Sequence, residues 1–368
     1  FGNIFTSHVF GQPTIVSCDP ELNFYILQNE DRLFQSSYPK PIHGILGEFS
    51  MLVIVGDAHK RIRSLALNMI NAAKTSTDFL HDIEWNAVYV FDRWNHEQNI
   101  VVCEEARKFT FNVMVKQILS LKPESPEALQ ILGELLTFMN GLVSLPLNIP
   151  GTRYARAVKS RFRIFATVKS IIDERRKRHD YTGGDFLDSI LTDSNLSDEE
   201  MQSLVLDLVF AGYETTSTLI SLVLKFLTDC PKALEQLKSE HEFIRRGKEK
   251  DECLNMDDYK QMTFTQNVIN EALRLGNVVK FVHRKAVKDI KFKEYDIPAG
   301  WKVLPILSAV HLDSSNFDNP FEFNPWRWKM PIAGKKFNPF GGGTRLCPGY
   351  ELARLEAAVF FHHLALSF

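Results

Sequence analysis

The chain has 368 residues, of which 45% are hydrophobic and 24% are charged, and its formal net charge is −2. This composition excludes disordered, collagen-like and low-complexity proteins, and it supplies enough apolar residues for a large core. A net charge near zero gives no field that would attract nucleic acid, so no nucleic-acid partner is expected. The 28 Phe residues need either a large apolar interior or an apolar ligand.

Helical patterns dominate the chain, and strand-like segments are short. Taken in chain order, strands are predicted at residues 14–17 and within 297–307. Long helices are predicted at residues 76–95, 126–145, 155–178, 197–228 and 263–275. Strands and helices do not alternate regularly, which argues against a doubly wound sheet. We therefore predict one large, mainly α unit with a minor β part, although length alone would allow two or three domains of about 150 residues.

The connections between these elements carry few signals. Residues 175–185 and 238–258 are strongly polar and are predicted to be solvated surface. Residues 146–151 separate two helical stretches and are predicted to form an ordinary loop. The five cysteines, at positions 18, 103, 230, 253 and 347, form no CxxC pair. This spacing argues against a disulfide framework and against a structural zinc site.

The ends of the chain suggest a fragment. The first residue is Phe1, and the last residues lie inside an apolar helical run, so we expect a piece of a longer protein. The sequence holds no run of 18 apolar residues and no signal peptide.

The helix predicted at 197–228 contains an unusual segment. It opens with Ser197 and Glu200, the two positions of a capping box, and it ends before Pro231, which suits the first turn of a following helix. Its centre is apolar almost all round, so it should cross the core. At residues 211–216 (AGYETT) a glycine precedes an acid and two threonines, whose hydroxyls can bond to helix carbonyls and bend the helix. Alone, this segment favours a core helix with a harmless kink.

A second segment, FNPFGGGTRLCPGYELARLE at residues 337–356, surrounds Cys347. Three consecutive glycines free the backbone to approach a flat ligand closely. Pro348 follows, and a helix is predicted from Tyr350, so the thiol lies near unpaired helix N–H groups and the positive end of the helix dipole. Both stabilise a thiolate, which serves either as a nucleophile or as a metal ligand. A phosphate cradle is a further alternative for GGGTR, although the Walker spacing is absent.

The complete pattern is more specific than its parts. The residues Phe340, Gly343, Arg345, Cys347 and Gly349 fit FxxGxRxCxG, which resembles the haem-thiolate signature of the cytochrome P450 family. The resemblance implies that these residues bind haem b, with Cys347 as the axial ligand of its iron. Arg345 would then pair with a haem propionate, and Phe340 would pack beside the ligand loop. An axial thiolate donates electron density to iron and favours O–O cleavage.

Other segments resemble scaffold and propionate-binding motifs of the same family. Glu271 and Arg274, together with Arg327 in the segment 319–328, resemble its buried structural triad, although ExxR alone would suit a surface ion pair. His59 and Arg63, four residues apart on one helix face, resemble a propionate-binding pair, although alone they suit a solvated surface.

Arg284 occupies the place of a third propionate ligand, in an early strand. The stretch before it, residues 275–282, lacks the prolines that the family often has there.

The segment at 211–216 resembles the family's AGx(D/E)TT. The resemblance implies that Ala211 lies against haem and that Glu214 and Thr215 are catalytic. Thr215 would hydrogen-bond the bound dioxygen, and Glu214 would link that position to bulk protons. Such relay groups are needed because the pocket otherwise excludes water.

Five motifs in the family's order imply the cytochrome P450 fold, mainly α with a long central helix over haem, as a single catalytic domain over residues 1–368. By resemblance the domain lacks its N-terminal membrane anchor and its C-terminal strands. The anchor would hold it at the cytosolic face of the endoplasmic reticulum membrane. Electrons would come from NADPH through a flavoprotein reductase, and a monomer is expected.

Several strings are narrower than the family: residues 147–152, 186–191, 276–285, 296–301 and 324–328. They resemble plant hydroxylases of steroid and terpenoid metabolism, above all the brassinosteroid-pathway enzymes that attack C-22 in the side chain of sterols. The resemblance implies oxygen insertion into a C–H bond of a sterol-like apolar substrate. The alternatives are another terpenoid hydroxylase, an isomerase or dehydratase that needs no dioxygen, and a non-enzymatic haem protein. The intact Glu214–Thr215 pair argues against the last two.

Overall fold

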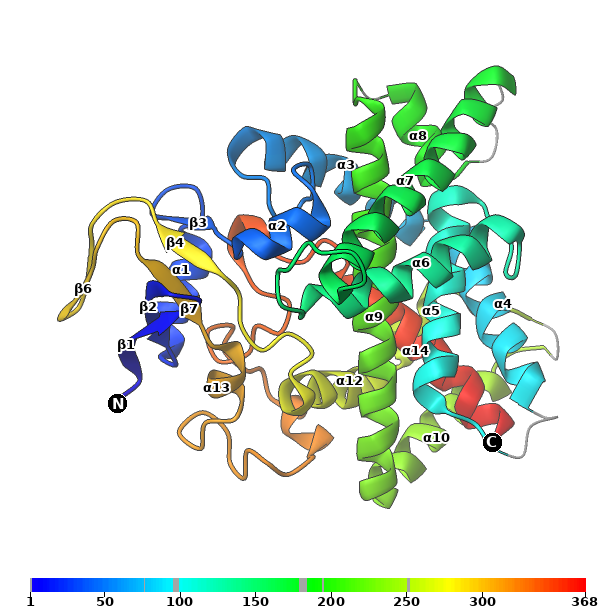
Figure 1. The fold of residues 1–368 in the computed structure, drawn as a ribbon. Coiled ribbons are helices and arrows are strands. Elements are labelled where there is room, and N and C mark those ends of the chain that lie inside the picture. Colours follow the sequence, from blue (N-terminus) through cyan, green and yellow to red (C-terminus); the bar gives the residue numbers. More distant parts are fainter. Residues whose placement is uncertain (1, 76, 95–98, 179–183, 194, 250–251) are drawn as a thin grey trace. The chain divides into compact units, whose positions relative to one another are not determined.

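The computed structural model describes residues 2–75, 77–94, 99–178, 184–193, 195–249 and 252–368. These residues are mostly helical with two small sheets, which confirms the predicted fold class (Figure 1). Contacts divide the chain into two compact units. The first unit consists of Phe1–Ser37, Lys74–Phe109 and Thr215–Phe368, and the second unit consists of Tyr38–Ala73 and Thr110–Glu214.

The elements follow one another along the chain as labelled in Figure 1. The helices are α1 (Pro20–Gln28), α2 (Lys40–Leu46), α3 (Gly56–Thr75), α4 (Thr77–Trp94), α5 (Val102–Leu119), α6 (Pro126–Leu142), α7 (Arg153–Arg178), α8 (Phe186–Asp193), α9 (Asp198–Asp229), α10 (Pro231–Arg246), α11 (Met256–Gln261), α12 (Thr263–Gly276), α13 (Leu307–His311) and α14 (Tyr350–Ser367). The strands are β1 (Ile4–Val9), β2 (Gln12–Ser17), β3 (Phe34–Ser36), β4 (Arg284–Ala286), β5 (Ile290–Phe292), β6 (Tyr295–Ile297) and β7 (Lys302–Pro305). Two short 3₁₀ helices are η1 (Pro325–Lys329) and η2 (Gly343–Arg345).

Helix α9 has the boundaries that its capping signals predict. The Ser197 N–H donates to Glu200 Oε2 at 2.9 Å, and the Glu200 N–H donates to Ser197 Oγ at 3.2 Å, so both halves of the capping box are present. The helix runs for 32 residues, and Pro231 begins α10. Every residue from 201 to 209 is buried, as expected for a helix that crosses a core.

Other predictions hold with shifted ends. The helix predicted at 126–145 ends at Leu142, because the Ser144 N–H bonds back to the Gly141 carbonyl and Val143 is fully exposed. The helix predicted at 76–95 is α4, and its two predicted end residues lie outside the described residues. Parts of the predicted surface stretches, residues 179–183 and 250–251, also lie outside them.

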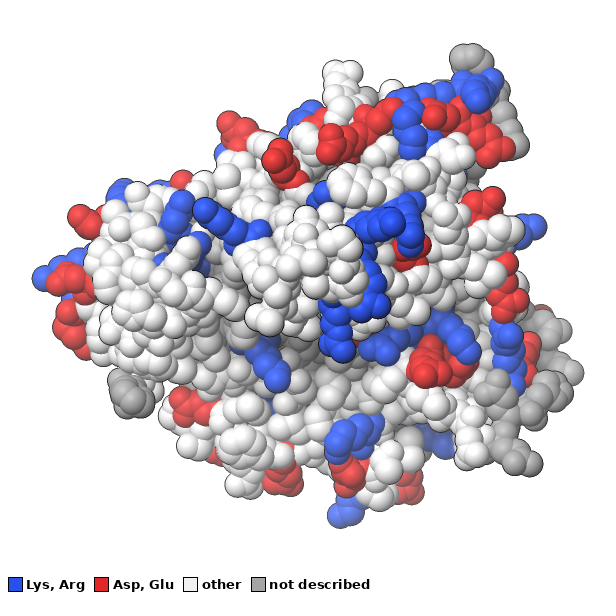
Figure 2. Space-filling model, in the orientation of Figure 1, with Lys and Arg blue, Asp and Glu red and all other residues white. Residues whose placement is uncertain are grey.

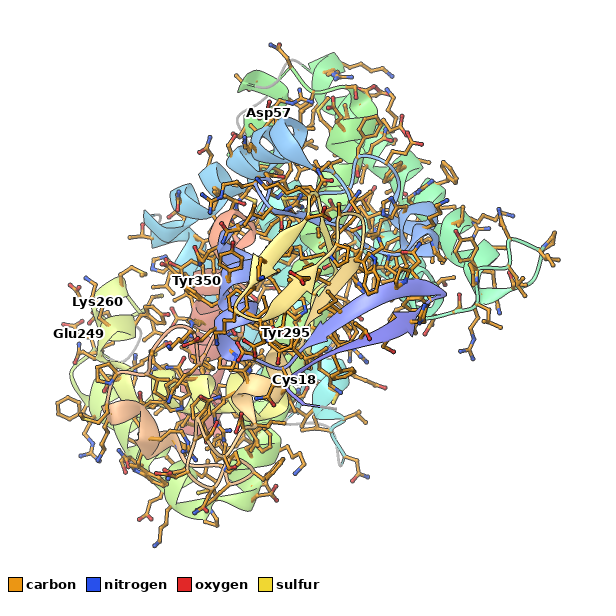
Figure 3. All side chains as sticks on the ribbon, turned by 90° about the vertical axis from the view of Figure 1, so that its left-hand side faces the viewer. Cys18, Asp57, Glu249, Lys260, Tyr295 and Tyr350 are labelled. Atoms are coloured by element: carbon orange, nitrogen blue, oxygen red, sulfur yellow. The ribbon has the colours of Figure 1, made fainter. Side chains whose placement is uncertain are left out.

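The larger sheet of the first unit joins segments from distant parts of the chain in the order β1-β2-β7-β4-β3. Strands β2 and β7 are parallel, with Thr14 opposite Lys302, and the other pairs are antiparallel. Figure 3 views this sheet, with blue strands from the start of the chain beside yellow and orange strands from near residue 300. Leu22 and Ile26 of α1 share one buried cluster with Ile15, Phe34 and Val303, so α1 packs on the sheet.

The helices of the first unit enclose an aromatic core. The ring of Phe360 on α14 is fully buried and lies 4.8 Å from the Phe91 ring and 5.2 Å from the Phe109 ring, between centroids. Trp94 and Phe361 also contact it. Part of the large Phe content therefore fills the interior.

In the second unit α6 packs along α7 (Figure 1). Gly141 permits this contact, because a Cβ there would lie 2.2 Å from the Cβ of Ala157. At the other end of α7, Arg175 makes ion pairs with Asp185 and Asp188, both at 2.6 Å. Figure 2 shows basic and acidic atoms intermixed where α7 and α8 lie, at the top of the picture. The described part of the polar stretch at 175–185 thus includes ion-paired residues rather than a purely solvated run.

Two sequence expectations concern absent features. Among the described residues none of the five cysteines forms a disulfide, and Cys18 is labelled in Figure 3. No helix in the described ranges combines the length and apolar character that a membrane crossing requires.

Candidate functional site

The loop from Phe340 to Gly349, called here the cysteine loop, belongs to the first unit. The Cys347 N–H donates to the Phe340 carbonyl at 3.0 Å and closes the loop. Gly341 and Gly343 have φ values of +76° and +62°, which non-glycine residues rarely adopt. Gly349 is the N-cap of α14, whose first residue, Tyr350, is labelled in Figure 3. The thiol of Cys347 is therefore held just before a helix N-terminus, as the sequence predicts.

The cysteine loop rests on α1. A Cβ at Gly343 would lie 2.1 Å from the carbonyl oxygen of Leu27, which leaves no room for any residue but glycine. The glycine run predicts close approach to a flat ligand, but at Gly343 the closest neighbour is the main chain of α1. The Phe340 ring lies under the guanidinium of Arg354 at 5.4 Å and packs against Tyr350 at 6.1 Å.

Two predicted site arginines meet at one carboxylate. Arg284 Nε lies 2.7 Å from Glu30 Oε2, and Arg345 Nε lies 3.2 Å from Glu30 Oε1. The side chain of Arg284 is 5% exposed, that of Arg345 is 8% exposed and that of Glu30 is 1% exposed. Burial lowers the pKa of Arg345, and the charge of Glu30 opposes that effect. No sequence pattern identifies Glu30, because it lies 254 and 315 residues from its partners and belongs to no recognised motif.

The predicted structural triad is assembled around Glu271. Its buried carboxylate accepts hydrogen bonds from Arg274 Nη2 at 2.8 Å and from Arg327 Nε at 2.9 Å. Two further donors, the Trp328 indole N–H at 2.9 Å and the Asn324 N–H at 3.0 Å, go beyond the prediction. Trp328 lies within the segment that resembles the family motif, so its position offered a signal.

Arg274 extends the same network. It donates through Nη1 to the carbonyls of His311 and Pro320, at 2.9 Å and 2.7 Å. The network thus attaches α12 to residues 311–328, the segment that precedes the cysteine loop in the sequence.

The predicted relay segment lies at the middle of α9. From residue 201 to 223, a stretch that is described throughout, only Ala211 and Thr215 are exposed. They are four residues apart and share one face of the helix. Gly212 lies against Met114, since a Cβ there would be 2.4 Å from the Met114 sulfur. The Thr110 hydroxyl donates to the Tyr213 carbonyl at 2.8 Å, so a residue of α5 holds the helix between these two exposed positions.

The remaining predicted residues fall in different units. His59 and Arg63 lie on α3 of the second unit, where His59 is buried and Arg63 is half-buried. Ala211 and Glu214 also belong to the second unit. Thr215, Arg284 and the cysteine loop belong to the first unit.

Within the second unit, the loop after α2 is attached to α9 through Asp207. The Asp207 carboxylate accepts a hydrogen bond from Ser50 Oγ at 2.8 Å and one from the Met51 N–H at 2.5 Å. Complete burial raises the pKa of Asp207 to about 7, although both hydrogen bonds act to lower it. This contact brings two apolar segments together, the loop near Met51 and the centre of α9.

The Asp207 pKa makes a prediction for stability. Because the folded pKa is raised from 3.8, the folded state keeps this proton when the unfolded state has lost it. The contribution of Asp207 to the free energy of unfolding should therefore fall as pH rises from about 4 to about 7. We expect Asp207→Asn to remove a difference on the order of 2 kcal/mol between pH 5 and pH 8. Urea unfolding at both pH values measures it.

The matched control is Asp229→Asn, at the exposed end of the same helix. It should leave the pH dependence as it is in the unmodified protein. An unchanged difference in Asp207→Asn would mean that this carboxyl titrates normally in the folded state.

Comparison with known proteins identifies the family to which this chain belongs. The family model described as "Cytochrome P450" matches residues 1–368. The chain is 56% identical over 377 residues to "Cytochrome P450 724B1" of Oryza sativa subsp. japonica, covering all of this chain and 78% of that protein. It is 49% identical over 377 residues to "Cholesterol 22-monohydroxylase CYP90B52" of Paris polyphylla, covering all of this chain and 80% of that protein.

A solved structure agrees in fold. The structure titled "Retinoic acid bound cyanobacterial CYP120A1" matches all of this chain and 84% of its own chain, with a TM-score of 0.90 and 25% identity. With the cysteine loop and the whole-length family match, these findings show that the chain belongs to the cytochrome P450 family of haem-thiolate monooxygenases.

Proposed function

We propose that the protein hydroxylates the side chain of a plant sterol or steroid, with C-22 as the carbon attacked. The observation that carries this proposal is the 49% identity, over the whole chain, to a relative named as a cholesterol 22-monohydroxylase. Residues 1–368 would act as a single catalytic domain, which the family match over that range supports.

The residues present fit a haem. Arg284 and Arg345 place two buried guanidinium groups side by side at Glu30, and guanidinium groups suit anionic propionates. Among the described residues, no group of three or more His, Cys, Asp or Glu side chains could hold a metal ion. A single thiolate at Cys347 is sufficient when a macrocycle supplies the other ligands of the iron.

The proposed roles follow from these positions. Cys347 would ligate the iron from the cysteine loop, with Gly343 and Gly349 shaping the loop and Phe340 packing beside it. Arg284 and Arg345 would bind the propionates, together with His59 and Arg63 of α3. When bound, the haem supplies an iron that activates dioxygen.

Protons would be handled by α9. The Thr215 hydroxyl lies on the exposed face of the helix, where its Oγ1 would donate a hydrogen bond to dioxygen and hold a proton in position. Glu214, the preceding residue, is half-buried and would exchange protons with solvent. Ala211, one turn earlier on the Thr215 face, has a small side chain that leaves room for a flat ligand. Glu271, Arg274 and Arg327 would hold the cysteine loop without taking part in chemistry.

Replacing the hydroxyl should uncouple the reaction. In Thr215→Ala we expect reductant to be consumed at a similar rate while product per reductant falls by about 10-fold or more, since positioned acid groups typically contribute at least this much. Hydrogen peroxide should account for the difference. The measurement compares the amount of NADPH consumed with the amounts of product and hydrogen peroxide formed.

The matched control is Thr228→Ala, an exposed threonine near the end of the same helix whose hydroxyl bonds only to the Leu224 carbonyl among the contacts described. It should remain fully coupled. Unchanged coupling in Thr215→Ala would remove the relay role from this residue.

Electrons would come from NADPH through a flavoprotein reductase, and the protein would work as a monomer at the cytosolic face of the endoplasmic reticulum membrane. Resemblance to the plant enzymes supports the electron source, the monomeric state and the location. The basic groups that could meet an acidic patch of the reductase include Lys335, Lys336 and Arg354. Of these, Lys335 pairs with Glu21 at 3.1 Å, and Arg354 stacks on Phe340.

The proposed substrate is tested with a panel of sterols. Binding is scored by the optical shift that accompanies displacement of water from ferric haem, and turnover with a competent reductase is scored by product mass and fragmentation. Cholesterol and related sterols with an intact side chain should both bind and gain one oxygen at C-22. Turnover restricted to non-steroidal terpenoids would overturn the sterol proposal and leave the family assignment unchanged.

A further inference from the structure

Glu30 occupies an unusual position between the two arginines proposed to bind propionates. It lies between α1 and β3, and its side chain is 1% exposed. Besides the two arginines, it accepts a hydrogen bond from the Ser36 N–H at 2.8 Å. Ser36 pairs with Arg284 across strands β3 and β4. The carboxylate is therefore anchored to the backbone of the strand next to one of the arginines that it binds.

The carboxylate of Glu30 contacts both guanidinium groups. Glu30 meets both groups at Nε, the guanidinium nitrogen nearest the main chain. The terminal nitrogens extend beyond Nε, and Arg284 uses Nη1 to donate to the His283 carbonyl at 2.9 Å. The Arg345 Nε–H donates a hydrogen bond to Glu30 Oε1, which restricts the plane of that guanidinium, and the ion pair keeps the Arg284 guanidinium beside the same carboxylate.

A carboxylate is also needed for reasons of charge. Two buried guanidinium groups repel each other strongly where the dielectric constant is low. The carboxylate shared by Arg284 and Arg345 offsets this repulsion, and the charge of the adjacent Asp31 also acts on Arg345. A neutral side chain in the same place would remove the one carboxylate that contacts both cations before any ligand binds.

We propose that Glu30 is a positioning residue for the haem propionates, holding Arg284 and Arg345 in the orientation that binds them. The proposal rests on the proposed function, in which these two arginines bind haem. It assigns to the end of α1 a part in cofactor retention that no sequence motif indicated.

The test uses the purified holoprotein and its Glu30→Gln variant. Gln keeps the size of the side chain and can still accept the Ser36 N–H, but it loses the charge. We expect haem to transfer to excess apomyoglobin about 10- to 100-fold faster, the range typical when an outer partner of a cofactor ligand is removed. The propionate bending modes in the resonance Raman spectrum should shift, whereas the ferrous–CO band should stay that of a thiolate-ligated haem.

Glu21→Gln is the matched control, because it removes a negative charge from a half-exposed residue of α1 whose ion pairs are with Lys293 and Lys335 and not with either arginine. Its rate of haem loss should stay within about 2-fold of the unmodified protein, since surface-type charge effects are small. Equal effects of the two variants, or an unchanged rate and unchanged propionate modes in Glu30→Gln, would overturn the proposal.

If Glu30→Gln does not fold, Glu30→Asp takes its place, since it keeps the charge but shortens the reach by one methylene. Positioning predicts faster haem loss with an unaltered ferrous–CO band, and a rate equal to that of the unmodified protein contradicts it. Failure of the proposed sterol hydroxylation is distinguishable, because a protein that turned over no sterol would still show the difference in haem loss between the Glu30 and Glu21 variants.

Discussion

Cys347→Ser should abolish the red-shifted Soret band that a ferrous–CO complex shows when a thiolate ligates the iron. The thiolate donates electron density to iron, and a serine hydroxyl stays protonated at neutral pH and donates far less. The loop itself should survive the change, since the closing bond from Cys347 to Phe340 uses the backbone N–H. The measurement is the difference spectrum of the reduced protein with and without CO, together with total haem by an independent assay.

Cys230→Ser is the control for this experiment. Cys230 is the N-cap of α10 and its thiol makes no capping hydrogen bond. Serine is a preferred N-cap, so this variant should be at least as stable as the unmodified protein and should keep the red-shifted band. A band that persists in Cys347→Ser would mean that another residue ligates the iron.

Glu271→Gln should destabilise the protein by about 3–5 kcal/mol, the cost typical of removing one partner of a buried ion pair. The Glu271 side chain is fully buried and receives hydrogen bonds from four residues, two of them charged. An amide has one acceptor oxygen, and its NH₂ group would face donors, so Arg274 and Arg327 would be left with uncompensated charge. The shift in the urea unfolding midpoint and the haem content of the purified protein report the effect.

Glu322→Gln provides the comparison, since Glu322 is exposed and its carboxylate bonds only to Asn319 among the contacts described. We expect a change within about 0.5 kcal/mol, as for most surface substitutions. If Glu271→Gln were equally mild, the network around it would be redundant for stability.

The helices that the sequence predicts well are those with explicit end signals. Helix α9 has a capping box at one end and a proline just past the other, and α12 buries Phe264, Val268 and Ala272 at the four-residue spacing of one helix face. Helix α5 is different, because five successive residues from Phe111 to Val115 are buried. A helix that is buried on all sides shows no apolar stripe, so periodicity cannot identify it.

The candidate site likewise contains some residues that the sequence predicts and others that it does not. The residues of the cysteine loop and the α12 pair lie close together in sequence, where spacing is informative. Glu30, Ser50 and Asp207 act through partners far away along the chain, and a lone acid or serine carries no pattern. The sheet is a further case, since β2 and β7 pair across more than 280 residues and only tertiary contacts select that partner.

The attachment of the cysteine loop to α1 also sets an order of events during synthesis. Leu27 must be in place for Gly343 to pack, and Glu30 must meet Arg345, a partner 315 residues later. Closing so long a loop is slow and costs conformational entropy, so these contacts form late in folding. The ribosome releases α1 long before it makes Cys347. Strands β2 and β3 therefore wait with open edges for β7 and β4, and the proposed haem ligand Cys347 is made only after all of these strands.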